Sequence, residues 1–514
     1  MDTTPDALEL VLDRAAAAAP ALAAQPPRAR AALLIALADA LEAARDRLVP
    51  IAERETGLTR ARLDGEVART AVQLRLFAEA VRAGDGADAR IDEADPGFVL
   101  GARPDLRRTR IPVGPVLNFS ASNFPFAFSV LGGDSASILA AGCPLIVKAH
   151  SGHPELSEAT AEVAQRVVED LGLPAGTLQL IHGQQAGVAA VQDSRVRAGS
   201  FTGSTLGGRI LADLAAARPA PIPFYGELGS VNPVFVTPAA MTENGPALAA
   251  DYVASVAGSA GQLCTKPGLL FAAQDDAFLS AVAEAGDAAG AAEHRLLGPR
   301  IAEAYRADLE AVLAIDGVDP VVSGTMRIDA EGDGWVTPTI VRVSLHTLRA
   351  HREVLAEEHF GPCSVIVDVP AEEPFAPLVG EFITGSLTGT LHLSRGERDG
   401  ASDAASAADA GADPALGALV SALAEHAGRV IFDGWPTGVA VTPAQQHGGP
   451  WPATTNDSST SVGTAAIGRF LRPVAFQNAP SAYLPAALRD ANPLGIPQRR
   501  SAAGESISWG RALG

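Results

Sequence analysis

Residues 114–148 read GPVLNFSASNFPFAFSVLGGDSASILAAGCPLIVK, and this stretch decides the fold class. The apolar run GPVLNF predicts a strand, the segment from Ser129 to Ala141 predicts a helix, and the apolar run PLIVK predicts a second strand. Strands that alternate with helices form βαβ units, whose strands are parallel and whose crossovers are right-handed. The stretch therefore predicts an α/β protein with a parallel sheet.

The alternation continues toward the carboxyl end as far as residue 228. The expected elements are a helix from Glu155, the strand TLQLIH, a short helix near Gln185, the strand VRAGSF, a helix over 206–217 and the strand PIPFYGEL. A second apolar α/β region is expected from about residue 231 to about residue 442. It is interrupted at 395–414 by a stretch rich in Ala, Asp, Ser and Gly, which we interpret as a solvated loop or weak helix without chemistry.

Toward the amino end, Leu and Ala recur at helical spacing from Pro5 to about Glu55 and predict a helical layer, broken at Pro20 and Pro26. A further helix is expected from about residue 67 to 82. The segment GFVLGARPDLRRTRIPV that follows predicts an extended hairpin or linker. The tail RFLRPVAFQNAPSAYLPAALRD has strand character and could pair with that segment or with another subunit.

Composition and charge restrict the class of protein. Of the 514 residues, 47% are apolar and 19% charged, as in a large globular α/β protein of two or three domains. The formal net charge of -20 argues against nucleic acid, because phosphate backbones are bound through clustered Lys and Arg. The expected partner is a small solute.

The cysteines and the amino terminus indicate a compartment. Three cysteines, Cys143, Cys264 and Cys363, cannot build a disulfide framework or a four-thiolate metal site, so no metal is expected. The amino terminus lacks the basic region and apolar run of a signal peptide, and no stretch approaches 18 strongly apolar residues. We expect a cytoplasmic protein without membrane contact.

Cys264 and Glu227 are candidates for covalent chemistry. Cys264 lies in SVAGSAGQLCTKPG, a run of small and turn-forming residues where a substrate and backbone N–H groups can reach a thiol. Glu227 lies in FYGELGSVNP at a strand end; if it is partly buried, its pKa rises toward neutrality and suits a general base. Taken alone, each fits a structural residue better, and Cys143 and Cys363 fit buried structural cysteines.

Two further segments are suited to binding. Asn123 follows a strand of the parallel sheet and offers an amide donor that could stabilise an oxyanion, although a lone Asn is more often a turn residue. The segment FTGSTLGGR joins a strand to a helix and presents Gly203, Ser204 and Gly208 where backbone N–H groups meet phosphate. It lacks GxGxxG spacing and is weak as an isolated motif.

Taken together, the ordered segments resemble the aldehyde dehydrogenase superfamily from about residue 30 to about residue 495. The segments that carry the resemblance are ASNFPF, AAGCPLIVKAH, FTGSTLGGR, ELGSVNP, GQLCTKPG, EEHFGP and RFLRPV. The resemblance implies oxidation of an aldehyde to a carboxylic acid through a thioester on Cys264. It implies that Asn123 and the Cys264 backbone N–H form the oxyanion hole and that Glu227 activates water.

The resemblance also implies a nicotinamide site. Lys148 would hold the adenosine ribose, Ser204 the pyrophosphate and Glu358 the nicotinamide ribose. The other expected cofactor contacts are His150, Ser151, Gly203, Gly208 and Phe360. NADP is the expected cofactor, with NAD as the alternative, because Ser151 stands where NAD-preferring relatives often carry a Glu that would repel a 2′-phosphate.

Within the superfamily, phrases such as ARPDLRR, GWPTGVAV, HGGPWPATTNDSSTSVGTAAI and RDANPLGI most resemble the 2-oxoglutarate semialdehyde (2,5-dioxopentanoate) dehydrogenases and the NADP-dependent long-chain aldehyde dehydrogenases. A substrate carboxylate favours an Arg partner, for which Arg75 on a predicted helix is the candidate. A fatty aldehyde would instead contact Phe124, Phe126, Leu263 and Trp451, which equally fit a core.

The expected architecture has two parallel-sheet α/β domains and a small bridging β element. Residues 1–96 and 115–228 form the nucleotide-binding domain, 229–442 the catalytic domain, 97–114 and 468–484 the bridging oligomerisation element, and 485–514 a tail. An exposed β edge needs a partner, so a homodimer or homotetramer is expected. The rival functions are an aliphatic aldehyde dehydrogenase, an acyl-phosphate-forming enzyme, which Glu227 disfavours, and an inactive scaffold protein.

Overall fold

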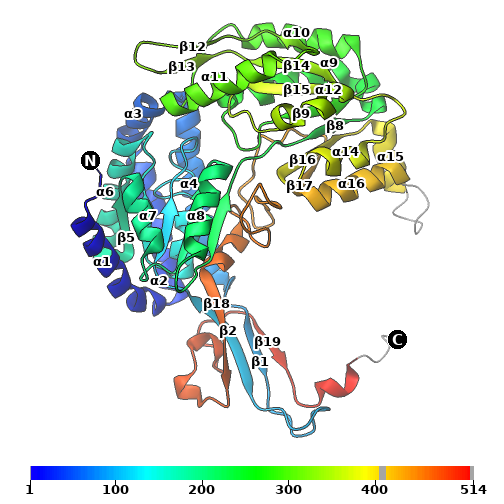
Figure 1. The fold of residues 1–514 in the computed structure, drawn as a ribbon. Coiled ribbons are helices and arrows are strands. Elements are labelled where there is room, and N and C mark those ends of the chain that lie inside the picture. Colours follow the sequence, from blue (N-terminus) through cyan, green and yellow to red (C-terminus); the bar gives the residue numbers. More distant parts are fainter. Residues whose placement is uncertain (1, 404–412, 510–514) are drawn as a thin grey trace.

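Two parallel sheets and a smaller projecting sheet organise residues 2–403 and 413–509, which the computed structural model describes (Figure 1). The first domain holds a five-stranded parallel sheet in the order β5-β4-β3-β6-β7. Its strands are β3 (Val116–Phe119), β4 (Leu145–Lys148), β5 (Leu178–Ile181), β6 (Ala198–Thr202) and β7 (Phe224–Glu227). The predicted parallel sheet is confirmed.

Helices connect these strands and fix where their loops lie. The connecting elements are α5 (Gly133–Ala141), α6 (Pro154–Asp170), α7 (Gln184–Gln192), α8 (Thr205–Ala216) and the short η1 (Ala175–Thr177). The chain passes outward from β3 through β4 to β5 and then returns to place β6 on the other side of β3. The loops after β3 and β6 thus flank a topological switch point, where open α/β sheets bind their ligands.

An amino-terminal helical layer covers this domain. It consists of α1 (Pro5–Ala23), α2 (Pro27–Ala43), α3 (Arg45–Thr56) and α4 (Arg60–Ala83). Leucines of α2, α3 and α4 share one buried cluster with α5 and α6, whereas Leu8 and Leu12 of α1 pack in a second cluster with β3, β4 and β5. The predicted break at Pro20 is wrong. Pro20 lies in the last turn of α1, where a proline removes only one backbone hydrogen bond and the helix still ends at Ala23.

The second domain contains a seven-stranded sheet in the order β11-β14-β15-β9-β8-β16-β17. All neighbours are parallel except the edge strand β11, which runs antiparallel to β14. The strands are β8 (Val234–Val236), β9 (Leu269–Ala272), β11 (Val318–Val322), β14 (Thr339–Ser344), β15 (Cys363–Asp368), β16 (Ser386–His392) and β17 (Ala427–Phe432). A small sheet adds β10 (His294–Arg295), β12 (Met326–Ile328) and β13 (Gly334–Val336).

The helices of this domain cover both faces of the large sheet. They are α9 (Pro238–Ala257), α10 (Asp276–Ala289), α11 (Pro299–Leu313), α12 (Leu345–Ala350), α13 (Arg352–Leu355), α14 (Phe375–Phe382), α15 (Arg395–Asp403) and α16 (Pro414–His426), with η2 (Gly258–Gly261) after α9. Two separate apolar clusters, one on each face, pack them against the strands. Of the two alternatives for 395–414, a solvated loop or a weak helix, the structure shows helix at 395–403, and the centre of the stretch, 404–412, lies outside the described residues.

A four-stranded sheet projects below the first domain as an arm (Figure 1). Its order is β18 (Leu471–Gln477), β2 (Leu106–Pro112), β1 (Ala89–Asp92) and β19 (Gln498–Ser501). The two segments expected to form the bridging element supply β18 and β2, which pair antiparallel. The arm also takes β1 from the segment assigned to the nucleotide domain and β19 from the segment assigned to the tail. Short 3₁₀ turns, η4 (Thr464–Phe470), η5 (Ser481–Tyr483), η6 (Ala486–Leu488) and η7 (Glu505–Ser508), complete the region.

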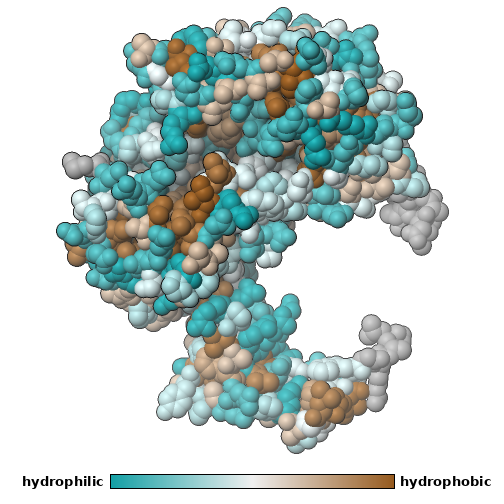
Figure 2. Space-filling view, viewed as in Figure 1, coloured by the Kyte–Doolittle hydropathy of each residue, from teal (hydrophilic) through white to brown (hydrophobic). Residues whose placement is uncertain are grey.

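Apolar side chains gather near the free end of the arm (Figure 2). The exposed large apolar residues of this region are Val99, Leu100, Tyr483, Ile507 and Trp509. Within 2–403 and 413–509, none of the helices combines the length and hydropathy that crossing a membrane requires.

Candidate active site

Loops at one edge of the five-stranded sheet carry most of the candidate residues. Asn123 follows β3, Lys148 ends β4, Ser204 follows β6 and Glu227 ends β7. Because the strands are parallel, their carboxyl ends meet at the same edge. The sheet therefore brings together residues that are far apart in the sequence, from Asn123 to Glu227.

Cys264 comes from the second domain, in the turn between α9 and β9. Before it, Ser259 and Ala260 adopt left-handed backbone conformations with φ of 54° and 55°, which are strained for residues that carry a Cβ atom. The amide of Asn232 donates to the carbonyl oxygens of Cys264 at 2.8 Å and Lys266 at 2.9 Å. The cysteine thus lies in a constrained turn whose backbone is held by a buried side chain.

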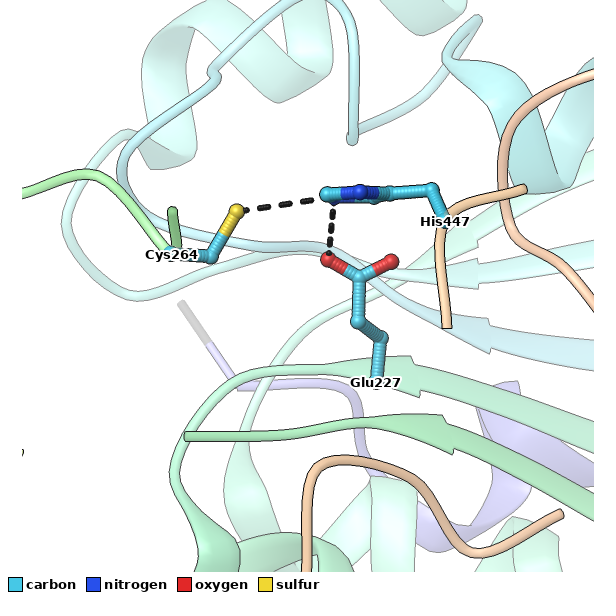
Figure 3. Close-up of side chains that lie close together, drawn as sticks. All are labelled: Glu227, Cys264 and His447. Atoms are coloured by element: carbon cyan, nitrogen blue, oxygen red, sulfur yellow. Dashed lines mark hydrogen bonds and ion pairs between the residues drawn. The ribbon is translucent and has the colours of Figure 1, made fainter. Parts of the chain in front are cut away.

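Cys264, His447 and Glu227 converge at the junction of the domains (Figure 3). Nε2 of His447 lies 3.6 Å from Sγ of Cys264 and 3.0 Å from Oε1 of Glu227. The hydroxyl of Ser461 donates to the second oxygen of Glu227. The imidazole is therefore placed to exchange a proton with either the thiol or the carboxylate.

His447 was not among the residues predicted from the sequence. It lies in the segment 433–463, which returns from the second domain and runs beside β7, where Leu228 N–H donates to Ala453 O at 2.8 Å. Its backbone N–H donates to Oγ1 of Thr460 at 2.8 Å. The motif HGGPWPATT contains this histidine, but a single His among ten has no sequence spacing that ties it to Cys264.

The three groups affect one another electrostatically. Burial acts to raise the pKa of Glu227, but the charge and hydrogen bond of His447 and the hydrogen bond of Ser461 lower it below its ordinary value. The expected rise toward neutrality is therefore wrong for this arrangement. Burial and the negative charges of Glu227 and Glu358 raise the pKa of the Cys264 thiol well above its ordinary value. The thiol is protonated at neutral pH and needs a base.

The same three side chains have ligand atoms within 4.8 Å of one another, a spacing that suits a metal ion. The absence of a metal thus stays a prediction for this site.

Asn123 lies against the turn that carries the cysteine. Its side-chain amide nitrogen donates to the backbone carbonyl oxygen of Gln262 at 3.0 Å, and its backbone carbonyl oxygen accepts from Nη2 of Arg62 at 2.5 Å. A primary amide has two N–H donors, so one remains for an oxyanion. The side chain is 6% exposed and its position is set by these contacts.

The residues expected to bind the pyrophosphate and nicotinamide ribose meet at the start of α8. The hydroxyl of Ser204 accepts from the N–H of Gly207 at 3.2 Å and caps the helix, whose free N–H groups favour an anion. A Cβ atom on Gly229 would lie 2.5 Å from Oε2 of Glu358 and 3.0 Å from Oγ1 of Thr205. A larger residue would displace the Glu358 carboxylate, so the glycine allows this carboxylate to approach the helix start. Burial raises the pKa of Glu358 to about 7.

The remaining cofactor candidates differ in their surroundings. Lys148 and Phe360 are half-buried, while Ser151 and Gly203 are exposed at the sheet edge. His150 accepts from the N–H of Gly152 at 3.0 Å, and burial lowers the pKa of its imidazole to about 3. A Cβ atom on Gly208 would lie 2.1 Å from Leu228, so this glycine permits close packing of α8. These residues fit a dinucleotide laid along the edge.

The substrate candidates do not form one group. Phe124 and Phe128 pack with ring centroids 5.6 Å apart beside the site, whereas Phe126 is buried in the core of the first domain. The ring of Trp451 lies under the guanidinium of Arg209 on α8, on the cofactor side, and Leu263 is half-buried next to Cys264. The structure does not bring Arg75 to the site. Its guanidinium pairs with Asp39 and Glu42, each at 2.6 Å, on the surface.

Cys143 and Cys363 lie in the cores of the two domains, as predicted. Burial raises the pKa of each thiol to about 11. The half-buried Cys264 is the cysteine with an acid–base partner. A half-buried cysteine beside a histidine, set between the loops of an open parallel sheet and a second α/β domain, is the arrangement expected of an enzyme that uses a cysteine and binds a nucleotide.

Sequence comparison identifies the family. The sequence model described as the aldehyde dehydrogenase family matches residues 1–376, and the chain belongs to this family. Alpha-ketoglutaric semialdehyde dehydrogenase 2 of Azospirillum brasilense is 41% identical over 94% of this chain and 89% of its own length. Alpha-ketoglutaric semialdehyde dehydrogenase of Acinetobacter baylyi is 40% identical over 91% and 85%.

The fold agrees with this assignment. The crystal structure of gamma-glutamyl-gamma-aminobutyraldehyde dehydrogenase from Burkholderia cenocepacia superimposes with a TM-score of 0.75 over 93% of this chain and 89% of that one, at 20% identity. The family and its named relatives show that the chain is an enzyme that oxidises aldehydes with NAD(P). The alternative of an inactive scaffold protein is therefore rejected.

Proposed function

We propose that this enzyme oxidises 2,5-dioxopentanoate to 2-oxoglutarate, with NADP as its preferred cofactor and Cys264 as its nucleophile. The similarity to two relatives named for alpha-ketoglutaric semialdehyde supports the substrate. The contact of His447 with both Cys264 and Glu227, at 3.6 and 3.0 Å, is the observation that carries the mechanism.

His447 accepts the thiol proton of Cys264, and the thiolate adds to the aldehyde carbon to form a C–S bond. The carbonyl oxygen becomes an oxyanion, which the free N–H of the Asn123 amide and the backbone N–H of Cys264 stabilise. NAD(P), when bound along Lys148, Ser204 and Glu358, supplies the hydride acceptor that allows the thiohemiacetal to become a thioester.

Glu227 then removes a proton from water as it attacks the thioester carbon, while His447 still carries the proton that it took from Cys264. The C–S bond breaks, the acid leaves and the proton returns to the Cys264 sulfur. The low pKa of Glu227 makes the carboxylate the resting form, so the base is ready at neutral pH. Ser461 keeps this carboxylate in position through its hydrogen bond.

The preference for NADP rests on Ser151. This residue is exposed beside the end of β4, three positions after Lys148, and its neutral side chain does not repel a 2′-phosphate. Lys148 adds a positive charge on the same edge.

The reaction is tested by following the formation of reduced nicotinamide with 2,5-dioxopentanoate and, separately, with medium and long aliphatic aldehydes, each with NADP and NAD. Selective oxidation of the dioxo acid, lost in Cys264→Ala, supports the proposal. Preference for aliphatic aldehydes would replace the substrate, and activity that survives Cys264→Ala would refute the mechanism.

The arm supports an assembly of two or four copies. Its edges and its exposed apolar residues need cover, and a second copy supplies a matching surface. Three unpaired thiols, one of them essential, fit a reducing compartment such as the cytoplasm. Light scattering of the purified enzyme tests the assembly, and a single-copy mass would contradict it.

A further inference from the structure

One face of α4 presents three charged residues to the loop that carries Asn123. Arg62, Glu66 and Arg69 are spaced i, i+4 and i+7, which places them on the same side of the helix. The two carboxylate oxygens of Glu66 differ in their hydrogen bonds. Oε1 accepts from the N–H groups of Phe126 at 2.8 Å and Ala127 at 2.9 Å, while Oε2 is buried without a partner. The face is thus built against the loop after β3.

Two aromatic rings hold the guanidinium groups of this face. The Arg62 guanidinium lies 4.9 Å from the ring centroid of Phe124, and that of Arg69 lies 5.3 Å from Phe124 and 5.6 Å from Phe128. Flat guanidinium groups stack well on aromatic faces. Stacking fixes their planes and directs the edge N–H groups to hydrogen-bond acceptors, one of which, for Arg62, is the backbone carbonyl oxygen of Asn123.

The cluster formed by Arg62, Glu66 and Arg69 with the rings of Phe124 and Phe128 lies next to the reacting groups. The ring of Phe128 lies 6.5 Å from that of His447, which contacts Cys264. Arg62 donates to the backbone carbonyl oxygen of Asn123, the residue proposed for the oxyanion hole. The positive charge of Arg69 is close enough to act on both Cys264 and Glu227. A small molecule attached to Cys264 therefore has this cluster beside it.

Arg69 lacks an acceptor in the part of the chain that the structure describes. Its guanidinium makes no hydrogen bond or ion pair there, and its Nε is buried without a partner, as is Nη1 of Arg62. Two cations face one carboxylate, Glu66, so one positive charge is left over. Unpaired buried donors of this kind are costly unless a ligand fills them.

We propose that Arg69, with Arg62 beside it, binds the carboxylate of the aldehyde substrate while the aldehyde carbon is attached to Cys264. This inference rests on the proposed function, and it names the group that selects a short aldehyde acid over a neutral aldehyde. A guanidinium offers two parallel N–H groups that match the two oxygens of a carboxylate. The substrate's charge also neutralises the excess positive charge of the cluster.

The test compares kcat/KM for 2,5-dioxopentanoate and for pentanal, which has the same number of carbons and no carboxylate. Arg69→Met keeps an unbranched side chain against Phe124 and Phe128 but removes the charge. We expect the ratio of the two kcat/KM values to fall about 10- to 100-fold, mainly through a higher KM for the dioxo acid. Arg69→Lys should recover part of the ratio, since a charge returns without the fork.

Arg75→Met is the matched control, because it makes the same substitution on the same helix at an arginine whose partners are Asp39 and Glu42. Its ratio should equal that of the wild type. Binding of 2-oxoglutarate, measured by calorimetry, gives a second readout and should weaken with Arg69→Met but not with Arg75→Met.

The outcomes separate the two proposals. A wild-type enzyme that does not oxidise the dioxo acid refutes the proposed function. A wild-type enzyme that does, with an unchanged ratio in Arg69→Met, overturns the role of Arg69 alone. An equal loss for both aldehydes would also overturn it, because Arg69 would then act on the Cys264 thiol and not on the substrate.

Discussion

Nε2 of His447 lies 3.6 Å from Sγ of Cys264, in a site where burial disfavours the thiolate. This relationship makes the histidine a positioned proton acceptor. Replacement by glutamine, His447→Gln, keeps the size and removes the base, so we expect kcat/KM to fall by about 10²- to 10³-fold. The measurement is the initial rate of reduced nicotinamide formation.

His346 provides a control for this substitution, because it is exposed on α12. His346→Gln should leave the rate as in the wild type. A His447→Gln enzyme with full activity would remove the histidine from the mechanism.

The pKa of Cys264 predicts how the free enzyme reacts with iodoacetamide. Burial and two nearby carboxylates raise this pKa, and only the thiolate is alkylated. Below the raised pKa, the thiolate fraction grows as pH rises, so the alkylation rate should increase about tenfold per pH unit from neutrality into the alkaline range. Mass spectrometry of the peptide containing Cys264 gives the rate. A rate that is flat from pH 7 upward would mean that the thiol is already ionised.

Glu227 is expected to serve the second half of the reaction. Glu227→Gln keeps the contact with Ser461 possible but removes the negative charge that activates water. We expect one rapid equivalent of reduced nicotinamide per active site, followed by a steady rate about 10²- to 10⁴-fold lower. Stopped-flow absorbance measures the burst, and intact mass detects the trapped acyl group. Loss of the burst as well would place Glu227 in the acylation step.

Ser151 is expected to set the cofactor preference. Ser151→Glu adds a carboxylate at an exposed position near Lys148, where it repels a 2′-phosphate and accepts from a 2′-hydroxyl. The ratio of kcat/KM for NADP to that for NAD should fall about tenfold or more. Ser151→Gln, which has the same size without the charge, is the control. Equal ratios in both variants would exclude a charge effect at this position.

A buried ion pair should be important for stability. Nη2 of Arg469 lies 2.6 Å from Oδ1 of Asp134, and the two side chains are 3% and 6% exposed. Arg469→Met leaves the Asp134 carboxylate buried without its partner, which should lower the free energy of unfolding by about 3–5 kcal/mol. The double variant Asp134→Leu with Arg469→Met should recover most of this loss. Denaturant unfolding measures both, and a single variant as stable as the wild type would contradict the expectation.

The sequence predicted the parts of the fold that depend on local pattern. Apolar strands alternating with helices predicted the five-stranded sheet, and the two segments of the bridging element include β2 and β18. It missed β19, because Gln498–Ser501 is polar and becomes a strand only by pairing with β1 across about 400 residues. Such long-range pairing leaves no local pattern.

The same distinction holds for the site. Cys264, Glu227 and Asn123 lie in motifs with a family resemblance, whereas His447 and Arg69 acquire their surroundings only from the fold. Arg75 was the candidate for the substrate carboxylate, since helical position alone does not distinguish it from Arg69. The two arginines differ in their partners: Arg75 forms ion pairs with Asp39 and Glu42, whereas these carboxylates do not contact Arg69.

The proposed nucleophile and the proposed hydrolytic base belong to different domains: Cys264 lies on the second domain and Glu227 ends a strand of the first. In the proposed reaction, the thioester is therefore carried by one domain and cleaved by a residue of the other. A small displacement between the two would change how long the acyl group persists without altering the interior of either domain. Residues along the contact between the domains, although far from the reacting atoms, can thus set the lifetime of the covalent intermediate.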